Sequence, residues 1–318
     1  MRIVIPIRET ETEMTFRGWD YFIAEIKTFS GNEKLMKLLD SQETKYIKNI
    51  EFDVKEKEVV FKNKIYKENF EQKNKRIYES YFFIIDIETT YKETDPFGLY
   101  DIMADTFLSK LSLILNLTYE FALDFLNGFV FNSEDLKLGE TTIVFCHMDF
   151  AYEHSRKIKW PNLQSIELNK TIDWFTNNGI SLELKSTNSA GRAINAFSHL
   201  FGDLSEKDSS FLFWSVLGIE SILARGTKDI SHQIKQKANL LLGEPNEFKK
   251  KITKLYEYRS RLIHGDFNFP PKYSSDFDNF EEEYWDYLAF SNSILIALIR
   301  KLINENKVEF EFEYKYCG

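Results

Sequence analysis

Arg259 and His264 combine two side chains that are suited to phosphate chemistry. Arginine keeps its positive charge at every physiological pH and can contact two phosphate oxygens at once. An imidazole titrates near neutral pH, so it can accept or donate a proton at a reacting oxygen. The pair is therefore a candidate site at which His264 moves a proton while Arg259 stabilises charge on the phosphate. The spacing alone is weak evidence, because a structural salt bridge and a helix cap explain the same two residues.

The helix expected around these residues does not by itself bring them together. His264 follows Arg259 by five positions, which corresponds to a rotation of about 140° on an ideal α-helix. Gly265 comes next, and a left-handed glycine at the helix end could turn the imidazole towards the arginine. Arg259 also falls within the apolar stripe of this helix, where a guanidinium needs a partner. We expect that partner to be an acid, a backbone carbonyl, a second subunit or a ligand phosphate.

Glu220 is the natural candidate for the partner of Arg259. It lies within a strongly apolar helical segment, and a buried carboxylate usually has a cationic partner. The alternative is that Glu220 lies on the helix surface and pairs with the nearby Arg225 or Lys228. The sequence pattern supports both arrangements equally.

Positive charge is concentrated near this motif. The whole chain has a formal net charge of −9 at pH 7, which argues against a protein that coats nucleic acid by global electrostatics. The segment from Arg225 to Arg261 nevertheless contains ten basic residues against four acids, so its local charge is +6. Such a segment fits a confined phosphate-binding surface. The expected backbone contacts, which carry little sequence information, come from Lys249, Lys250, Lys251, Lys254 and Arg261.

Two domains are expected from the length of 318 residues and from a change in periodicity. The small and polar segment at residues 186–191 interrupts the pattern, so we place a boundary after residue 190. Residues 1–190 are expected to form an α+β domain without a recognisable catalytic pattern, with a role in sensing or substrate recognition. Residues 191–306 are expected to form an all-α bundle. Residues 307–318 alternate apolar and charged side chains, which predicts a short C-terminal β-strand.

Local patterns predict the individual elements. In the first domain they predict strands at residues 2–7, 81–87 and 141–145, a hairpin of residues 51–54 and 58–61, and helices at residues 100–116 and 118–127. In the second domain they predict helices at residues 192–201, 206–224, 230–242, 247–264 and 277–304. Glu220 is thus expected on one helix, and Arg259 and His264 on another.

Composition disfavours several classes of protein. Apolar residues make up 43 % of the chain, so disorder is not expected. No apolar run reaches the roughly 18 to 20 residues of a membrane helix, and no secretory signal is recognisable, so we expect a cytoplasmic protein. Cys146 and Cys317 lack the neighbours of a zinc motif. Around Arg259 no acids or histidines have a spacing that would hold Mg²⁺ or Zn²⁺, so we expect neither metal nor cofactor.

Arg259 and His264 lie in a segment that resembles the Apea-like branch of the HEPN superfamily. The residues Tyr-Arg-Ser at positions 258–260 and Ile-His-Gly at positions 263–265 match the way in which members of this branch end a helix. The segment at positions 211–223, with Glu220 embedded in it, is similar to the first core helix of the family. The resemblance covers about residues 204–300 and does not reach the first domain.

The resemblance implies a helical bundle that acts as a metal-independent endoribonuclease, with two copies of the motif paired across a homodimer interface. In that arrangement Arg259 holds the scissile phosphate, His264 is the general base or acid, and the 2′-hydroxyl of the RNA is the nucleophile. Many active members have Asn, Asp or His directly after the arginine, whereas this chain has Ser260. The alternative is a non-catalytic module that holds RNA, a nucleotide or a partner protein on the same basic face. A role in antiphage defence is implied by analogy with the branch.

Overall fold

The computed structural model describes residues 1–7, 17–40, 46–73, 81–90, 99–120, 125–145, 148–202, 210–226, 228–245, 250–266 and 278–312. The chain divides into two compact units, one built around a β-sheet and one built from helices. The sheet unit comprises Met1–Cys146, Glu167–Thr176 and Phe201–Leu204, and the helical unit comprises His147–Ile166, Asn177–Leu200 and Ser205–Gly318. This division differs from the expected boundary after residue 190.

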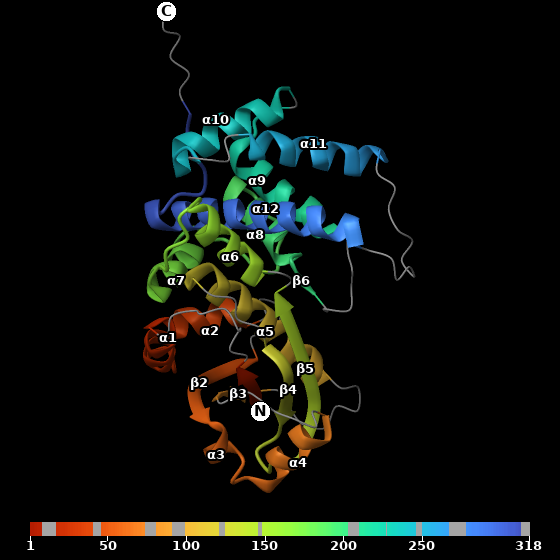
Figure 1. Cartoon of the computed structure of the whole chain (residues 1–318). Helices are drawn as coiled ribbons and strands as arrows, with labels where there is room; N and C mark the ends of the chain where they lie inside the picture. The colour runs from red at the N-terminus through yellow and green to blue at the C-terminus, as the bar shows by residue number, and fades with distance from the viewer. Residues whose placement is uncertain are drawn as a thin grey trace, which may run out of the picture. The chain divides into compact units, whose positions relative to one another are not determined.

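Five antiparallel strands and one two-residue strand form the sheet (Figure 1). In spatial order they are β2 (Ile47–Glu56), β3 (Tyr81–Thr89), β1 (Arg2–Ile7), β4 (Phe125–Phe131), β5 (Lys137–Phe145) and the short β6 (Phe201–Gly202). The sheet is accompanied by the helices α1 (Arg17–Thr28), α2 (Glu33–Leu39), α3 (Lys57–Val60), α4 (Lys64–Lys73), α5 (Leu99–Thr118) and α7 (Leu168–Asn177). The expected α+β character is thus confirmed.

The alternation of side chains along the strands separates two apolar faces. On one face, Phe83 of β3 contacts Phe22 of α1 edge to face, with ring centroids 6.1 Å apart. On the other face, Val4 of β1 belongs to a buried cluster with Tyr66 and Phe70 of α4. The sheet is therefore covered by helices on one side and, over part of its area, by α3 and α4 on the other.

Two elements of the sheet unit differ from the predictions. The predicted hairpin does not form, because β2 pairs with β3 and the predicted second arm at residues 58–61 begins as helix α3. The predicted helix at residues 118–127 is also wrong where the structure describes it, since β4 begins at Phe125. Gly128 lies in this strand, where an added Cβ would approach the Thr141 side chain to 2.7 Å. The glycine therefore marks close packing within the sheet and not the end of a helix.

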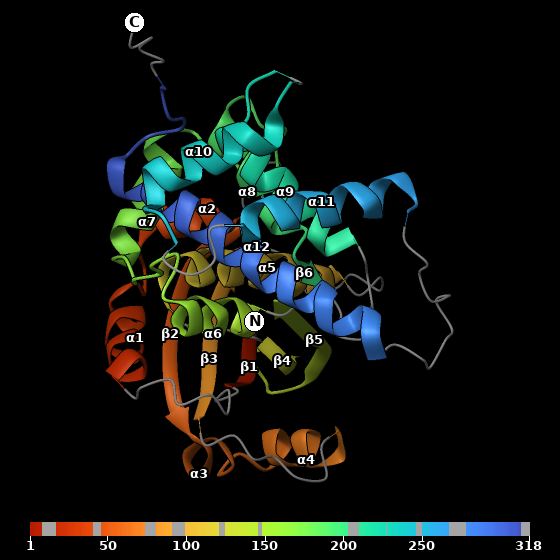
Figure 2. The same cartoon turned by 45° about the horizontal axis from the view of Figure 1, so that its top comes forward.

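Six helices form the helical unit, as far as the structure describes it. They are α6 (Met148–Ile158), α8 (Ser189–Ser198), α9 (Ser210–Leu223), α10 (Ile230–Leu242), α11 (Lys251–His264) and α12 (Asp278–Glu305). Figures 1 and 2 show α12 along the middle of the unit, with α10 and α11 on one side and α6 on the other. At Gly218 of α9 an added Cβ would lie 2.8 Å from Leu295 of α12, so the two helices pack closely there. No helix among the described residues is long and apolar enough to cross a membrane.

The polar segment at residues 186–191 begins a helix and does not separate the two units. Asn188 is the N-cap of α8, and its side chain accepts a hydrogen bond of 2.7 Å from the backbone N–H of Gly191. Asparagine is a preferred N-cap because its side chain satisfies a free N–H at the helix start. The same residue types mark loops and helix starts, which is why this segment suggested a boundary.

The predicted C-terminal strand does not form over the part that the structure describes. Val308–Phe312 has no strand partner, although the carbonyl of Val308 accepts a hydrogen bond of 2.9 Å from Ala190. Phe310 is buried within the helical unit. The apolar residues of this alternating segment are therefore used for packing on helices. The remaining predicted strand residues, 313–318, lie outside the described residues.

Candidate functional site

Helix α11 presents a mostly basic face, which we call the α11 stripe. Its members are Lys250, Lys254, Arg261 and His264, and all four are exposed. Their spacings of four, seven and three positions place them within an arc of about 80° on an ideal α-helix. Glu257 lies in the same arc and is the acid of this face. The stripe therefore carries three permanent positive charges and one imidazole.

Arg259 lies on the opposite side of α11 and pairs with Glu220 of α9. The Nη2 atom of Arg259 is 3.7 Å from Oε2 of Glu220, and the two side chains are 25 % and 15 % exposed. Of the two arrangements that the sequence allowed for Glu220, the pairing with Arg259 is confirmed. Arg225 pairs instead with Glu309, at 3.5 Å.

The pair lies in a poorly solvated part of the helical unit. Burial raises the pKa of Glu220, and the nearby Arg259 opposes this rise. Burial also raises the pKa of Tyr256 well above its ordinary value, and the charge of Glu220 adds to the effect. The Nε atom of Arg259 and the hydroxyl of Tyr256 have no hydrogen-bond partner among the described residues. At 3.7 Å the ion pair is longer than a hydrogen bond, so it links α9 to α11 mainly by charge.

His264 remains part of the last helical turn. Gly265 caps α11 in the left-handed conformation, with φ 78° and ψ 17°, so the predicted glycine cap is confirmed. The N–H groups of Gly265 and Asp266 both donate to the carbonyl of Arg261. Because the cap residue is Gly265, His264 keeps a helical position, and its imidazole lies on the exposed face beside Arg261. Within the described residues, no hydrogen bond or ion pair joins His264 to Arg259, and Ser260 between the two faces is partly buried.

Lys251 is not on the α11 stripe. Its Nζ atom lies 2.7 Å from Nε2 of His154 and 2.8 Å from a carboxylate oxygen of Asp286, and its side chain is 12 % exposed. Burial would raise the pKa of Asp286, but the hydrogen bonds from His154 and Lys251 outweigh it and hold the pKa at about 2. The structure therefore uses Lys251 to join α6, α11 and α12, and not to extend the predicted phosphate-binding surface.

Arg225 and Lys237, two further basic residues of the segment from Arg225 to Arg261, contact the C-terminal segment. A groove of about 950 Å³ lies between α10, the preceding connection and residues 309–312. Lys237 lines it, donates to the carbonyl of Leu223 at 2.6 Å and lies 4.8 Å from the centroid of the Phe312 ring. Burial lowers the pKa of Lys237, and Arg225 lowers it further. Lys249 lies outside the described residues. Among the described residues of this segment, the exposed cations are Arg225, Lys228 and the three of the α11 stripe.

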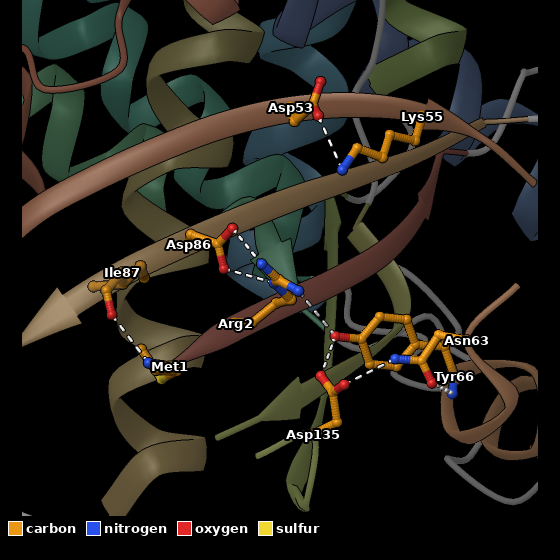
Figure 3. A network of polar contacts seen from close by, with 9 residues as sticks. All are labelled: Met1, Arg2, Asp53, Lys55, Asn63, Tyr66, Asp86, Ile87 and Asp135. Atoms are coloured by element: carbon orange, nitrogen blue, oxygen red, sulfur yellow. Dashed lines mark hydrogen bonds and ion pairs between the residues drawn. The ribbon is translucent and has the colours of Figure 1, made fainter. Parts of the chain in front are cut away.

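The sheet unit contains a polar network that the sequence did not indicate (Figure 3). Arg2 of β1 donates to both carboxylate oxygens of Asp86 on β3, at 2.7 and 2.9 Å. Arg2 also donates to the hydroxyl of Tyr66, which donates to Asp135, and Asn63 donates to the second oxygen of Asp135. The side-chain pairs that these hydrogen bonds join are 64 to 84 positions apart in the sequence, so no local pattern reveals them. The network fastens α4 and the turn after β4 to the sheet.

Comparisons with known proteins do not extend this description. No family model matches the chain, and neither the curated proteins nor the solved structures contain a protein that matches it.

Proposed function

We propose that the protein is an endoribonuclease that binds an RNA backbone on the α11 stripe and uses His264 to transfer a proton. The observation that supports this proposal is an exposed imidazole at the end of a mostly basic helix face. Arginine and lysine on one face can follow successive phosphates, and an imidazole beside them can act on the phosphodiester that they hold. The HEPN-like motif described from the sequence points to the same reaction.

The nucleophile in this proposal belongs to the substrate. The 2′-hydroxyl oxygen forms a bond to phosphorus, the bond from phosphorus to the 5′-oxygen breaks, and the products carry a 2′,3′-cyclic phosphate and a 5′-hydroxyl. His264 accepts the 2′-hydroxyl proton or supplies a proton to the leaving oxygen. One imidazole performs one of these steps at a time, so a homodimer through the helical unit would supply the second. The reaction needs no metal, and a role in antiphage defence rests on the resemblance alone.

The test is cleavage of a labelled single-stranded RNA by the full chain in EDTA. We expect His264→Ala to lower the rate by roughly 100- to 10,000-fold, the usual contribution of a general acid or base. His232→Ala is the matched control, because His232 is also an exposed helical histidine but lies on α10. RNA with a 2′-O-methyl group at the scissile nucleotide should resist cleavage. Wild-type activity of His264→Ala, or activity that EDTA abolishes and Mg²⁺ restores, would contradict the proposal.

A second candidate is an RNA-binding module without catalytic activity. The observation that favours it is the pairing of Arg259 with Glu220 on the side of α11 away from His264. In that case the wild type and His264→Ala would both bind the labelled RNA, and neither would cleave it. Binding measured in the same samples by fluorescence anisotropy separates the two functions.

A further inference from the structure

Arg261 and His264 are neighbours on the surface of α11. They lie three positions apart, which places their Cβ atoms about 5 to 6 Å from each other on a helix. Both side chains are exposed. Arg259 precedes His264 by five positions and is rotated by about 140° from it. Arg261 is therefore the arginine whose side chain shares a face with the imidazole.

The turn that carries Arg261 and His264 is fixed by its own cap. The carbonyl of Arg261 accepts hydrogen bonds from the N–H groups of Gly265 and Asp266, the second of them at 2.9 Å. These two bonds close the helix end over the residues between them, in the manner of a glycine C-cap. The cap fixes the backbone from which both side chains extend, and this limits the separations that they can adopt around a single phosphate.

A phosphate at this end of α11 meets negative charge from the helix itself. A helix C-terminus carries the negative end of the helix dipole, and the exposed Asp266 adds a negative charge there, so a phosphate needs a nearby cation. The charge of Arg259 is opposed by Glu220 at 3.7 Å. Glu257, an acid of the same helix, lies four positions before Arg261, and Lys254 adds a further positive charge to this face.

We infer that Arg261 is the cation that contacts the scissile phosphate beside His264, and that Arg259 acts through Glu220 to position α11. This inference rests on the proposed function. The guanidinium of Arg261 would donate to two non-bridging oxygens of the phosphate while His264 transfers a proton at the 2′- or 5′-oxygen. The substrate is a phosphodiester with a free 2′-hydroxyl, and the recognition is of its backbone and not of its base.

The experiment compares kcat and KM for the same labelled RNA across matched variants of the full chain. Arg261→Ala should lower kcat by roughly 100- to 1,000-fold, as loss of a transition-state donor does. Arg261→Lys should recover only part of that loss, because lysine cannot contact two oxygens in the same way. Arg259→Lys keeps a cation near Glu220 and should remain within a few-fold of the wild-type kcat. Lys228→Ala, which removes an exposed cation away from the stripe, is the control that should change neither constant.

The outcomes separate this inference from the function on which it rests. If the wild type cleaves RNA and Arg261→Ala retains the wild-type kcat, the inference fails and the proposed function stands. The inference also fails, and the proposed function stands, if Arg259→Lys lowers kcat more than Arg261→Ala does. If the wild type does not cleave RNA at all, both fail together.

Discussion

Removing the guanidinium of Arg259 should destabilise the helical unit. Its Nη2 atom is 3.7 Å from Oε2 of Glu220, and the side chains are 25 % and 15 % exposed. At an effective dielectric constant of about 20, unit charges at that distance attract by about 4 kcal/mol. Desolvation of both groups offsets most of this attraction in the wild type, whereas loss of one partner leaves the other charge buried. We therefore expect Arg259→Met to cost about 3 kcal/mol in the free energy of unfolding.

The pH dependence of the stability lost in Arg259→Met shows whether the carboxylate of Glu220 is the group left unpaired. Burial already raises the pKa of Glu220, and removal of Arg259 takes away the interaction that opposes the rise. An acid whose pKa is higher in the folded state binds more protons there, so it reduces stability at high pH and ceases to do so once it is protonated. The deficit of Arg259→Met should therefore shrink as the pH falls from 7 towards 5. Adding Glu220→Gln should recover part of the stability at pH 7, with a coupling of roughly 1 to 3 kcal/mol.

Thermal unfolding measures the loss of stability of Arg259→Met. Hydrogen exchange of peptides from α9 and α11 shows whether the loss lies in the helical unit. Hydrogen exchange reports the local stability of the helical unit separately from that of the sheet unit. A loss of about 3 kcal/mol corresponds to a Tm lower by roughly 6 to 12 °C for a unit of this size. Lys228→Met is the control for loss of an exposed cation and should stay within about 1 °C of the wild type. An equally small change for Arg259→Met, or additive effects of Arg259→Met and Glu220→Gln, would refute the reasoning.

Two further predictions concern association. The protein should be a homodimer through the helical unit, and a light-scattering mass of one subunit in a sample that cleaves RNA would contradict this. RNA binding should weaken with salt with a slope of log K against log [salt] of about −2 per chain, because three stripe cations each contribute about −0.7 on a single strand. A slope near −7 would mean instead that all ten basic residues of the segment from Arg225 to Arg261 contact phosphates.

The charge count of the sequence located the basic region but overestimated the surface that it forms. Arg225 and Lys251 pair with Glu309 and Asp286, which lie outside the counted segment, and Arg259 pairs with Glu220, which precedes it. A count along the chain includes only acids that are near in sequence. The exposed cations Lys250, Lys254 and Arg261 lie at helical spacing on one face of α11, an arrangement that a count along the chain does not show.

The helices with long regular patterns were predicted well. The errors occurred where contacts between residues far apart in the sequence determine the secondary structure. The predicted helix at residues 230–242 has the same bounds as α10. The predicted strand at residues 58–61 was wrong because Val60 packs on the sheet face with Phe82 and Phe129, residues that no local pattern connects to it. The pairing of Glu220 with Arg259 could be proposed from the sequence because both are charged residues within apolar helical stripes. The network of Arg2 could not, because each of its members has an ordinary polar environment in the sequence.

Arg259 and His264 could meet at one phosphate in two ways, and the structure indicates which is less costly. Within one chain, the last turn of α11 would have to unwind, which breaks the two hydrogen bonds that Gly265 and Asp266 donate to Arg261. At about 1 kcal/mol each, these bonds make unwinding cost about 2 kcal/mol, whereas release of Arg259 from Glu220 is common to both routes. A second copy of α11 placed against the first leaves both bonds intact, so association is the less costly route to a site that uses Arg259. Neither is needed if Arg261 supplies the cation, because the helix already places that arginine and His264 side by side. The kcat values of Arg261→Ala and Arg259→Lys therefore decide which of the two arginines contacts the phosphate.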